Sequence, residues 1–328
     1  MNTKEIISKL TDSQKERLLR EAIDFAVMND KIKQTRPDSC PCCGKKARMI
    51  KKGFAHGKQR YQCKECGKKF VYDSHTITSG LKIEKEQLIE ICLDTLSLVP
   101  IAQTAARLDL SIQCVFRNRH KFLTFLEQLL AAEPEKLSGT CEFDETYIQE
   151  SCKGSKPKNR KARHRGEPSC YRGISREKVC IVTTTDRTSH EIFKAVGLAK
   201  PTQRSILENF EESIEKGSIL YVDGTNSYDQ LADKCFCGIS HLITKSSYNK
   251  VEHLNNVNAI HRMIKNCIQT YRGIATKYIH RYCALFRFLR KFLDMDRNEM
   301  ADQLLQFHKT QIQDIHMEKL KNYHIFGC

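Results

Sequence analysis

The sequence lacks any apolar run long enough to cross a membrane, and it lacks a basic-then-apolar stretch at its start. A membrane helix needs about 20 predominantly apolar residues, whereas the best candidate, residues 88–102, contains Glu90 and Asp94. The opening residues, MNTKEIISKLTDSQKER, do not have the pattern of a secretory signal peptide. These absences predict a folded protein of the cytoplasm with no membrane partner.

Acidic residues are scarce in two stretches of the chain. The sequence carries 55 Lys and Arg against 39 Asp and Glu, a net charge of +16. Residues 40–70 hold ten basic residues and one acid, residues 151–172 hold eight and one, and together they account for the whole excess. Such blocks favour a polyanionic partner, although a solvated charged loop has the same composition. Tyr61 and Phe70 lie in the first block and support DNA contact there.

The second block is rich in Gly, Pro and basic residues and is predicted to be a mobile loop between two strands. This composition disfavours packing into a core. The predicted role is to contact DNA phosphates through Lys156, Lys158, Arg160 and Lys161.

The sixteen cysteines predict thiols rather than a disulfide framework, because the chain is long and has no export pattern. Six of them lie among apolar residues and are expected to be small core side chains. These six are Cys92, Cys114, Cys141, Cys180, Cys267 and Cys283.

Four other cysteines form two CxxC pairs. Cys40 and Cys43 form the first pair, Cys63 and Cys66 form the second, and a glycine follows each pair. Four thiolates in two such turns match a closed tetrahedral Zn²⁺ site, and a closed site is structural because catalytic zinc needs an open position. Cys42 remains an alternative ligand next to the first pair.

Residues 84–128 have the apolar periodicity of three helices. Pro100 opens the second helix and Ser111 can cap the third, with a tight turn at Asp109 between them. Two short helices joined in this way are typical of a helix-turn-helix, although any three-helix bundle shows a similar pattern. The candidate DNA contacts on the third helix are Arg117, Asn118 and Lys121.

The remaining chain changes from helical to strand periodicity after a linker that begins at Ala131. Strands are expected over residues 140–148, 179–185, 190–196, 218–223 and 240–244, and helices over 13–28, 203–216, 226–232 and 253–269. Strands first, followed by alternating strands and helices, predict a mixed α/β domain.

Three positions of this domain carry side chains that suit a divalent cation. Asp144 lies in the first strand, Asp223 ends a later strand and Asn258 lies on the long helix, two turns before Lys265. Carboxylate and amide oxygens are ligands for Mg²⁺ or Mn²⁺. Taken singly, each residue is explained as a strand-edge charge, a turn residue or a surface amide. Their joint placement favours a metal site.

The chain resembles the DDE-type transposases of bacterial insertion sequences over residues 37–295. The resemblance rests on CPCCG, YQCKECGKKF, FDETYI, YVDGTNSYDQLA and HLNNVNAIHRMIKNCIQTYRGIATKYIHRY. It implies an α/β (α+β) architecture in which a ribonuclease-H-like catalytic domain with a mixed sheet follows a zinc ribbon and a helix-turn-helix. The implied divisions are a helical segment 1–36, a zinc ribbon 37–72, a helix-turn-helix 80–130, the catalytic domain 138–295 and a helical tail 296–328.

The resemblance also implies roles for individual residues. Asp144 and Asp223 correspond to the two catalytic aspartates, Asn258 stands where a glutamate is usual, and Lys265 matches the basic residue that holds a DNA phosphate. The implied cofactors are two Mg²⁺ or Mn²⁺ per active site and one structural Zn²⁺. The implied partners are element ends and target DNA, bound by a homo-oligomer at the bacterial nucleoid.

The implied reaction is metal-dependent cleavage at the ends of an insertion sequence, followed by strand transfer into target DNA. Asn258 departs from the family pattern and leaves one carboxylate fewer at the metal site. Two alternatives therefore stand beside the transposase: a zinc-ribbon and helix-turn-helix DNA-binding protein with an inactive catalytic domain, and a metal-dependent nuclease of the same fold.

Overall fold

The computed structural model describes residues 39–55, 58–71, 74, 81–132, 134–155, 161, 163–164, 167–242 and 252–293. The helix expected over residues 13–28 and the tail 296–328 lie outside these ranges. The chain divides into two units, one over residues 133–289 and the other including residues 4–132, and each is described by itself.

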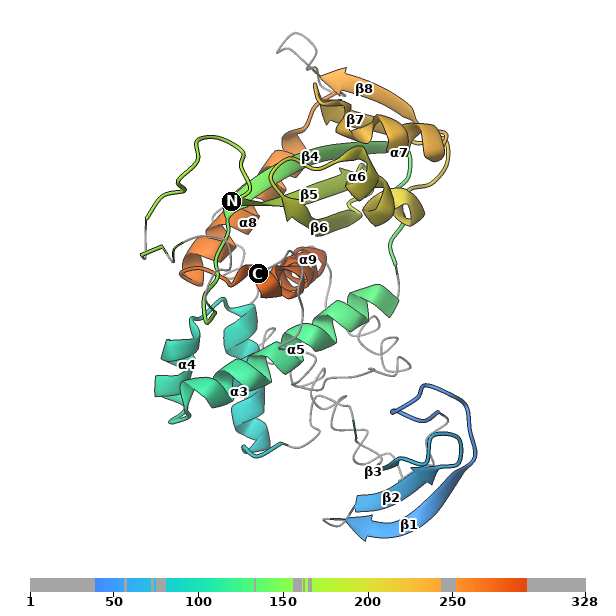
Figure 1. The fold of residues 1–328 in the computed structure, drawn as a ribbon, viewed down its shortest axis with the longest axis vertical. Coiled ribbons are helices and arrows are strands. Elements are labelled where there is room, and N and C mark those ends of the chain that lie inside the picture. Colours follow the sequence, from blue (N-terminus) through green and yellow to red (C-terminus); the bar gives the residue numbers. More distant parts are fainter. Residues whose placement is uncertain are drawn as a thin grey trace. The chain divides into compact units, whose positions relative to one another are not determined.

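The cysteine-rich module is a three-stranded antiparallel sheet (Figure 1). Its strands are β1 (Met49–Ala55), β2 (Lys58–Cys63) and β3 (Lys69–Val71). Tyr61 and Phe70 stack with ring centroids 6.1 Å apart and are buried with Met49, Cys40 and Cys63. The expectation that these two aromatic residues face DNA is therefore wrong. So small a sheet has few apolar side chains with which to build a core.

Three helices follow the small sheet: α3 (Lys85–Leu96), α4 (Ile101–Arg107) and α5 (Ile112–Ala132). They share a core of Ile91, Ala105 and Val115. Ser111 caps α5 as expected, because its Oγ accepts a hydrogen bond from the backbone N–H of Cys114 at 3.1 Å. The helix α5 runs further than the sequence predicts, since Ala131 and Ala132 continue it in place of a linker.

A mixed five-stranded sheet of order β6-β5-β4-β7-β8 forms the centre of the second unit (Figure 1). The strands β4, β5 and β6 pair antiparallel, whereas β7 and β8 run parallel to β4. This topology confirms the predicted ribonuclease-H-like α/β class. The strands are β4 (Thr140–Gln149), β5 (Lys178–Asp186), β6 (Glu191–Leu198), β7 (Ile219–Asp223) and β8 (Gly238–Leu242).

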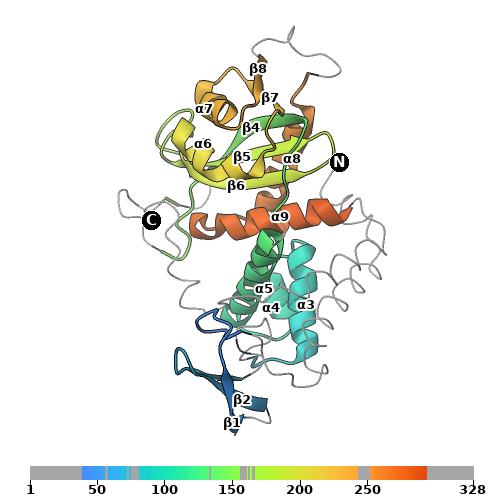
Figure 2. The ribbon, with the colours of Figure 1, turned by 90° about the vertical axis from the view of Figure 1, so that its right-hand side faces the viewer.

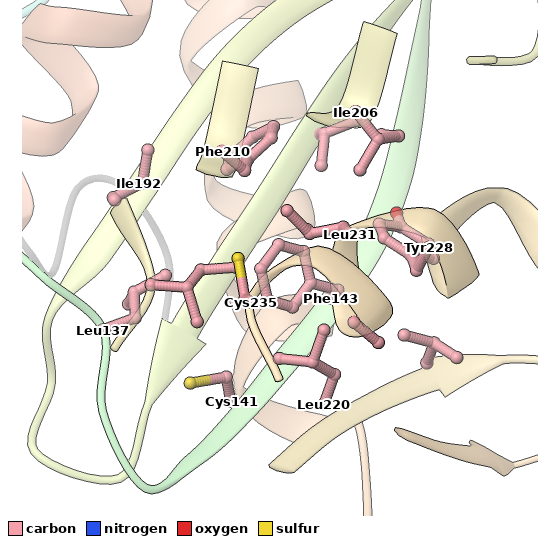
Figure 3. Close-up of a cluster of buried hydrophobic side chains, with 14 of the residues drawn as sticks. Leu137, Cys141, Phe143, Ile192, Ile206, Phe210, Leu220, Tyr228, Leu231 and Cys235 are labelled. Carbon is pink, nitrogen blue, oxygen red and sulfur yellow. The ribbon is translucent and has the colours of Figure 1, made fainter. Parts of the chain in front are cut away.

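Helices cover both faces of this sheet, with α6 and α7 on one side and α8 on the other (Figure 1 and Figure 2). The side chains between α6, α7 and the sheet form the main core, in which Phe143, Phe210 and Tyr228 pack together (Figure 3). On the opposite face, Val257 packs beside Tyr221. The helices are α6 (Gln203–Phe210), α7 (Asp229–Lys234), α8 (Asn255–Thr270) and α9 (Ile279–Leu293).

The helix expected over residues 203–216 ends early. After Phe210 the chain forms a short 3₁₀ turn, and Ile214 then adopts an extended backbone that bridges to Leu137 in parallel. The bridge between Ile214 and Leu137 requires an extended backbone at Ile214, so the helix cannot continue through that residue. The helix α9, most of whose side chains are buried, has no counterpart among the predicted elements.

Candidate active site

Two aspartates meet where β7 ends beside β4. The two strands run parallel, and their last paired residues are Phe143 and Val222. Asp144 and Asp223 follow directly, so the register brings them to the same level of neighbouring strands. One carboxylate oxygen each from Asp144, Glu145 and Asp223 lies within 4.8 Å of the others. The structure thus brings together two predicted site residues and adds a third carboxylate.

Glu145 was missed by the sequence argument. Consecutive residues of a strand point to opposite faces, so the pattern of β4 predicts that Glu145 turns away from Asp144. The signal was its acidic neighbour in the segment FDETYI. Because β7 ends at Asp223, no further strand residue separates the Glu145 side chain from the two aspartates.

Asp144 lies in an enclosed, negatively charged environment. Burial raises its pKa to about 7, the charges of Glu145 and Asp223 add to the rise, and the charge of Lys265 opposes it. A bound cation would favour the charged form of all three carboxylates. The donor set therefore fits a hard divalent cation such as Mg²⁺ or Mn²⁺.

A buried histidine of α8 supports Asp144 from the helix side. His261 Nδ1 lies 3.7 Å from Asp144 Oδ2, and its Nε2 lies 2.6 Å from Thr183 Oγ1. The Thr183 hydroxyl also donates to the backbone carbonyl of Asp144 at 3.2 Å. Burial, followed by the charge of Lys265, lowers the pKa of His261 to about 4. The ring is therefore neutral at neutral pH and adds no charge to the site.

The strand that carries Asp144 also holds the start of α8. Glu142, two residues earlier and on the same face, is fully buried. Its Oε2 accepts hydrogen bonds from the backbone N–H groups of Asn256 at 3.0 Å and Val257 at 3.2 Å. A carboxylate at a helix N-terminus satisfies free N–H donors and the helix dipole. Arg187 Nη1 donates to Glu142 Oε1 at 2.5 Å and compensates its charge. Glu142 thereby fixes α8 against β4.

The two predicted residues of α8 lie three residues before and four residues after His261, on the helix face that turns towards Asp144. Asn258 and Lys265 are exposed, whereas Val257, Ile260 and Ile264 turn inwards. Among the described residues, no hydrogen bond or ion pair joins Asn258 or Lys265 to the three carboxylates. The positive charge of Lys265 nevertheless lowers the pKa of Asp144 and of His261.

The four predicted zinc ligands converge in the small sheet. The Sγ atoms of Cys40, Cys43, Cys63 and Cys66 lie within 4.8 Å of one another, with Cys40 and Cys66 at 3.7 Å and Cys43 and Cys63 at 3.9 Å. Tetrahedral Zn²⁺ with Zn–S bonds of about 2.3 Å separates its sulfurs by about 3.8 Å. The thiol of Cys42 is not part of this cluster, although its backbone N–H donates to Cys40 Sγ at 3.4 Å.

The pKa values of two cysteines in the cluster shift in opposite directions. Backbone N–H groups, that of Cys66 first, lower the pKa of Cys63 to about 7, which favours its thiolate. Burial raises the pKa of Cys40 to about 12. A cation among the sulfurs would stabilise all four thiolates. The geometry and the ligand chemistry fit a zinc ribbon.

The candidate DNA contacts of α5 differ in accessibility. Arg117 is exposed, whereas Asn118 is only 8% exposed and its Nδ2 donates to the carbonyl of Cys114 at 3.0 Å. Lys121 is half-buried, and burial lowers the pKa of its ammonium. Arg117 is therefore the most available of the three for contact with DNA.

Described residues of the second basic block are held by Glu177, which accepts hydrogen bonds from the Ser169 hydroxyl at 2.6 Å and the backbone N–H of Cys170 at 2.9 Å. Lys156, Lys158 and Arg160 lie outside the described residues, and Lys161 is exposed. Arg163, however, forms an ion pair of 2.8 Å with Glu177, and both side chains are buried. The sequence predicts that this block does not pack into a core, and the structure adds that Glu177 neutralises the buried guanidinium of Arg163.

Comparison with known families agrees with this geometry. Residues 136–291 match the model of the ISXO2-like transposase domain. No curated protein matches the chain significantly. Among solved structures, a pre-cleavage Mos1 transpososome is matched at 10% sequence identity and a TM-score of 0.23, over 64% of this chain and 75% of that chain. Among the helices that the structure describes, none has the length and apolar character of a membrane span.

Proposed function

Because residues 136–291 form a DDE-type, ISXO2-like transposase domain, we propose that this protein cleaves DNA at the ends of an insertion sequence and joins the cleaved ends to target DNA. The observation that carries the proposal is the convergence of Asp144, Asp223 and Glu145 at the edge where the parallel strand β7 ends beside β4. In α/β folds this edge is where ligand-binding groups commonly gather.

In the proposed site, Asp144 and Asp223 hold Mg²⁺ or Mn²⁺, with Asn258 as a neutral oxygen donor. Two such cations, when bound, stabilise the attacking and leaving oxygens of an in-line displacement at phosphorus. Other groups of the protein orient these ligands: His261 and Thr183 hold the Asp144 segment, and Glu142 holds the start of α8. Lys265 binds a phosphate beside the scissile bond.

The proposed reaction has two steps. In the first, water attacks the phosphodiester at the element end, its oxygen bonds to phosphorus, and the P–O3′ bond breaks; the products are a 5′ phosphate and a free 3′ hydroxyl, which takes up a proton. In the second, that hydroxyl loses its proton and attacks a phosphodiester of target DNA, so that a new P–O3′ bond forms while the target's own P–O3′ bond breaks and releases a target 3′ hydroxyl. Positioning and charge stabilisation supply the catalysis, and no covalent bond to the protein is needed.

The other proposed DNA contacts lie outside the catalytic centre. They comprise the zinc ribbon with one structural Zn²⁺, the exposed Arg117 of α5 and the basic block 151–172. Both element ends and target DNA must be held at once, which favours a homo-oligomer assembled on DNA. A chain with these partners would act at the bacterial nucleoid.

A cleavage and joining assay tests the proposal. The full chain is incubated with Mg²⁺ or Mn²⁺, a duplex carrying the terminal inverted repeat that flanks its gene, and a supercoiled target plasmid. We expect nicks with 3′ hydroxyls at the repeat and products in which the repeat is joined to the plasmid. Cutting without joining would identify a nuclease, and binding without cutting would identify an inactive DNA-binding protein.

The basic block predicts a specific change in salt dependence. Replacing Lys156, Lys158, Arg160 and Lys161 by Gln should weaken DNA binding. Each lost phosphate contact removes about 0.9 from the slope of log affinity against log salt, so four contacts remove about 3.6. Fluorescence anisotropy over a salt series measures the slope.

The matched control removes the same kind of charge elsewhere. Lys216 and Lys234 are exposed basic residues near α7. Their replacement by Gln should leave the slope at the parent value. If the block variant also keeps the parent slope, the block does not contact phosphates.

A further inference from the structure

We infer that Glu145 is a metal ligand of the catalytic centre and supplies the carboxylate that Asn258 cannot. This inference rests on the proposed function and identifies the third acidic ligand of the same site. It departs from the expected roles, in which position 258 completes the ligand set.

The Glu145 carboxylate lies close enough to both aspartates to share a cation with them. One of its oxygens lies within 4.8 Å of an oxygen of Asp144 and of Asp223. An octahedral Mg²⁺ with bonds of about 2.1 Å holds neighbouring ligand oxygens about 3.0 Å apart and opposite ones about 4.2 Å apart. Small movements of three side chains therefore close the cluster around one cation.

A buried tyrosine orients the Glu145 carboxylate. The Tyr228 hydroxyl donates to Glu145 Oε1 at 2.8 Å. Tyr228 is fully buried and its ring packs against Phe143, with centroids 5.4 Å apart (Figure 3). One oxygen of Glu145 is thus fixed by a rigid donor, and the other is left for a cation. Carboxylates that bind metals are commonly held by such a second hydrogen bond.

The charge balance of the site points the same way. Among the described residues, no Lys, Arg or His lies within 4.0 Å of a carboxylate oxygen of Glu145 or Asp223, and Asp144 has only His261 at 3.7 Å. Three acids this close repel one another unless a cation compensates them. Glu142, also on β4, shows the contrast, since Arg187 neutralises it.

Asn258 is the weaker candidate for the third ligand. Its amide is neutral, and its side chain is exposed on α8. With Asn258 as the third ligand the set carries two negative charges, whereas Glu145 raises the total to three. Divalent cations prefer carboxylate to amide oxygen when both are in reach, because the charge interaction is larger.

Mn²⁺ binding to the full chain, measured without DNA by electron paramagnetic resonance, tests the inference. Glu145→Gln keeps the size of the side chain and an oxygen for the Tyr228 hydroxyl. We expect it to weaken Mn²⁺ binding at least about tenfold, and to weaken it more than Asn258→Ala does. Glu208→Gln, at an exposed carboxylate of α6, is the charge control and should bind Mn²⁺ like the parent.

The possible outcomes separate this inference from the proposed function. If Glu145→Gln binds Mn²⁺ like the parent while Asp144→Asn loses it, the inference fails and the site stands. If Asn258→Ala loses more affinity than Glu145→Gln, the inference also fails. If Asp144→Asn binds like the parent as well, the proposed metal site itself is wrong. Circular dichroism of each variant establishes that the fold is intact.

Discussion

Replacing either Asp144 or Asp223 by Asn is expected to abolish strand cleavage and joining, while binding to the element ends persists. Each substitution removes one negative charge from the cluster of three carboxylates and keeps the size of the side chain. The stabilisation that a divalent cation gives to a phosphoryl transition state is several kcal/mol, and each 1.36 kcal/mol corresponds to about a tenfold change in rate. A loss of at least about 10³-fold in cleavage rate should follow.

The measurement is the rate of 3′ hydroxyl formation at the terminal repeat, with DNA affinity determined in parallel. Affinity should remain near the parent value, because the zinc ribbon, α5 and the basic block contribute most of the proposed DNA contacts. Asp233→Asn, at an exposed position of α7, is the control and should cleave normally. Cleavage by both active-site variants at the parent rate with Mg²⁺ would show that the active-site assignment is wrong.

The second large effect is expected at the cysteine cluster. The core of the small sheet consists of only five buried residues, and two of them, Cys40 and Cys63, are predicted zinc ligands. Metal binding in modules of this size contributes about 10–16 kcal/mol to folding. Cys63→Ser should therefore lose the bound Zn²⁺ and unfold the ribbon, while the five-stranded sheet of the other unit remains folded.

Elemental analysis and hydrogen exchange measure this effect. The parent protein should contain about one Zn²⁺ per chain, and amides of β1 to β3 should be protected only when the metal is bound. Cys42→Ser is the matched control: its thiol lies outside the cluster of four sulfurs, so the variant should keep both Zn²⁺ and protection. A ribbon that is folded and free of metal would contradict the prediction.

The sequence by itself was sufficient wherever neighbours along the chain decide the structure. The two CxxC pairs predict a cluster of four sulfurs because each pair already brings two ligands to one turn. The alternation in β4 and the apolar run of β5 predict strands, and Ser111 marks the start of α5. The class of the domain followed from the order of these elements. Each of these features depends on local spacing, which a single sequence displays.

The positions of side chains that meet from distant segments were less predictable. Asn118 and Lys121 have the residue types of DNA contacts, yet packing around α5 buries the first and half-buries the second. Tyr61 and Phe70 lie among lysines in the sequence but form the core of the small sheet. In each case the residue type is compatible with two environments, and only the three-dimensional packing selects one.

At the acidic cluster, the sequence predicted some of the residues and the tertiary structure decided the others. The sequence determined that Asp144 and Asp223 lie on or at the end of strands, but it did not indicate that Glu145 joins them. Only the tertiary structure decided that β7 stops beside Asp144, that Tyr228 reaches Glu145 and that Glu142 fastens α8 to β4. The physical reason is that strand register and helix docking depend on pairings between residues far apart in the chain. Composition and periodicity describe each segment alone and do not contain those pairings.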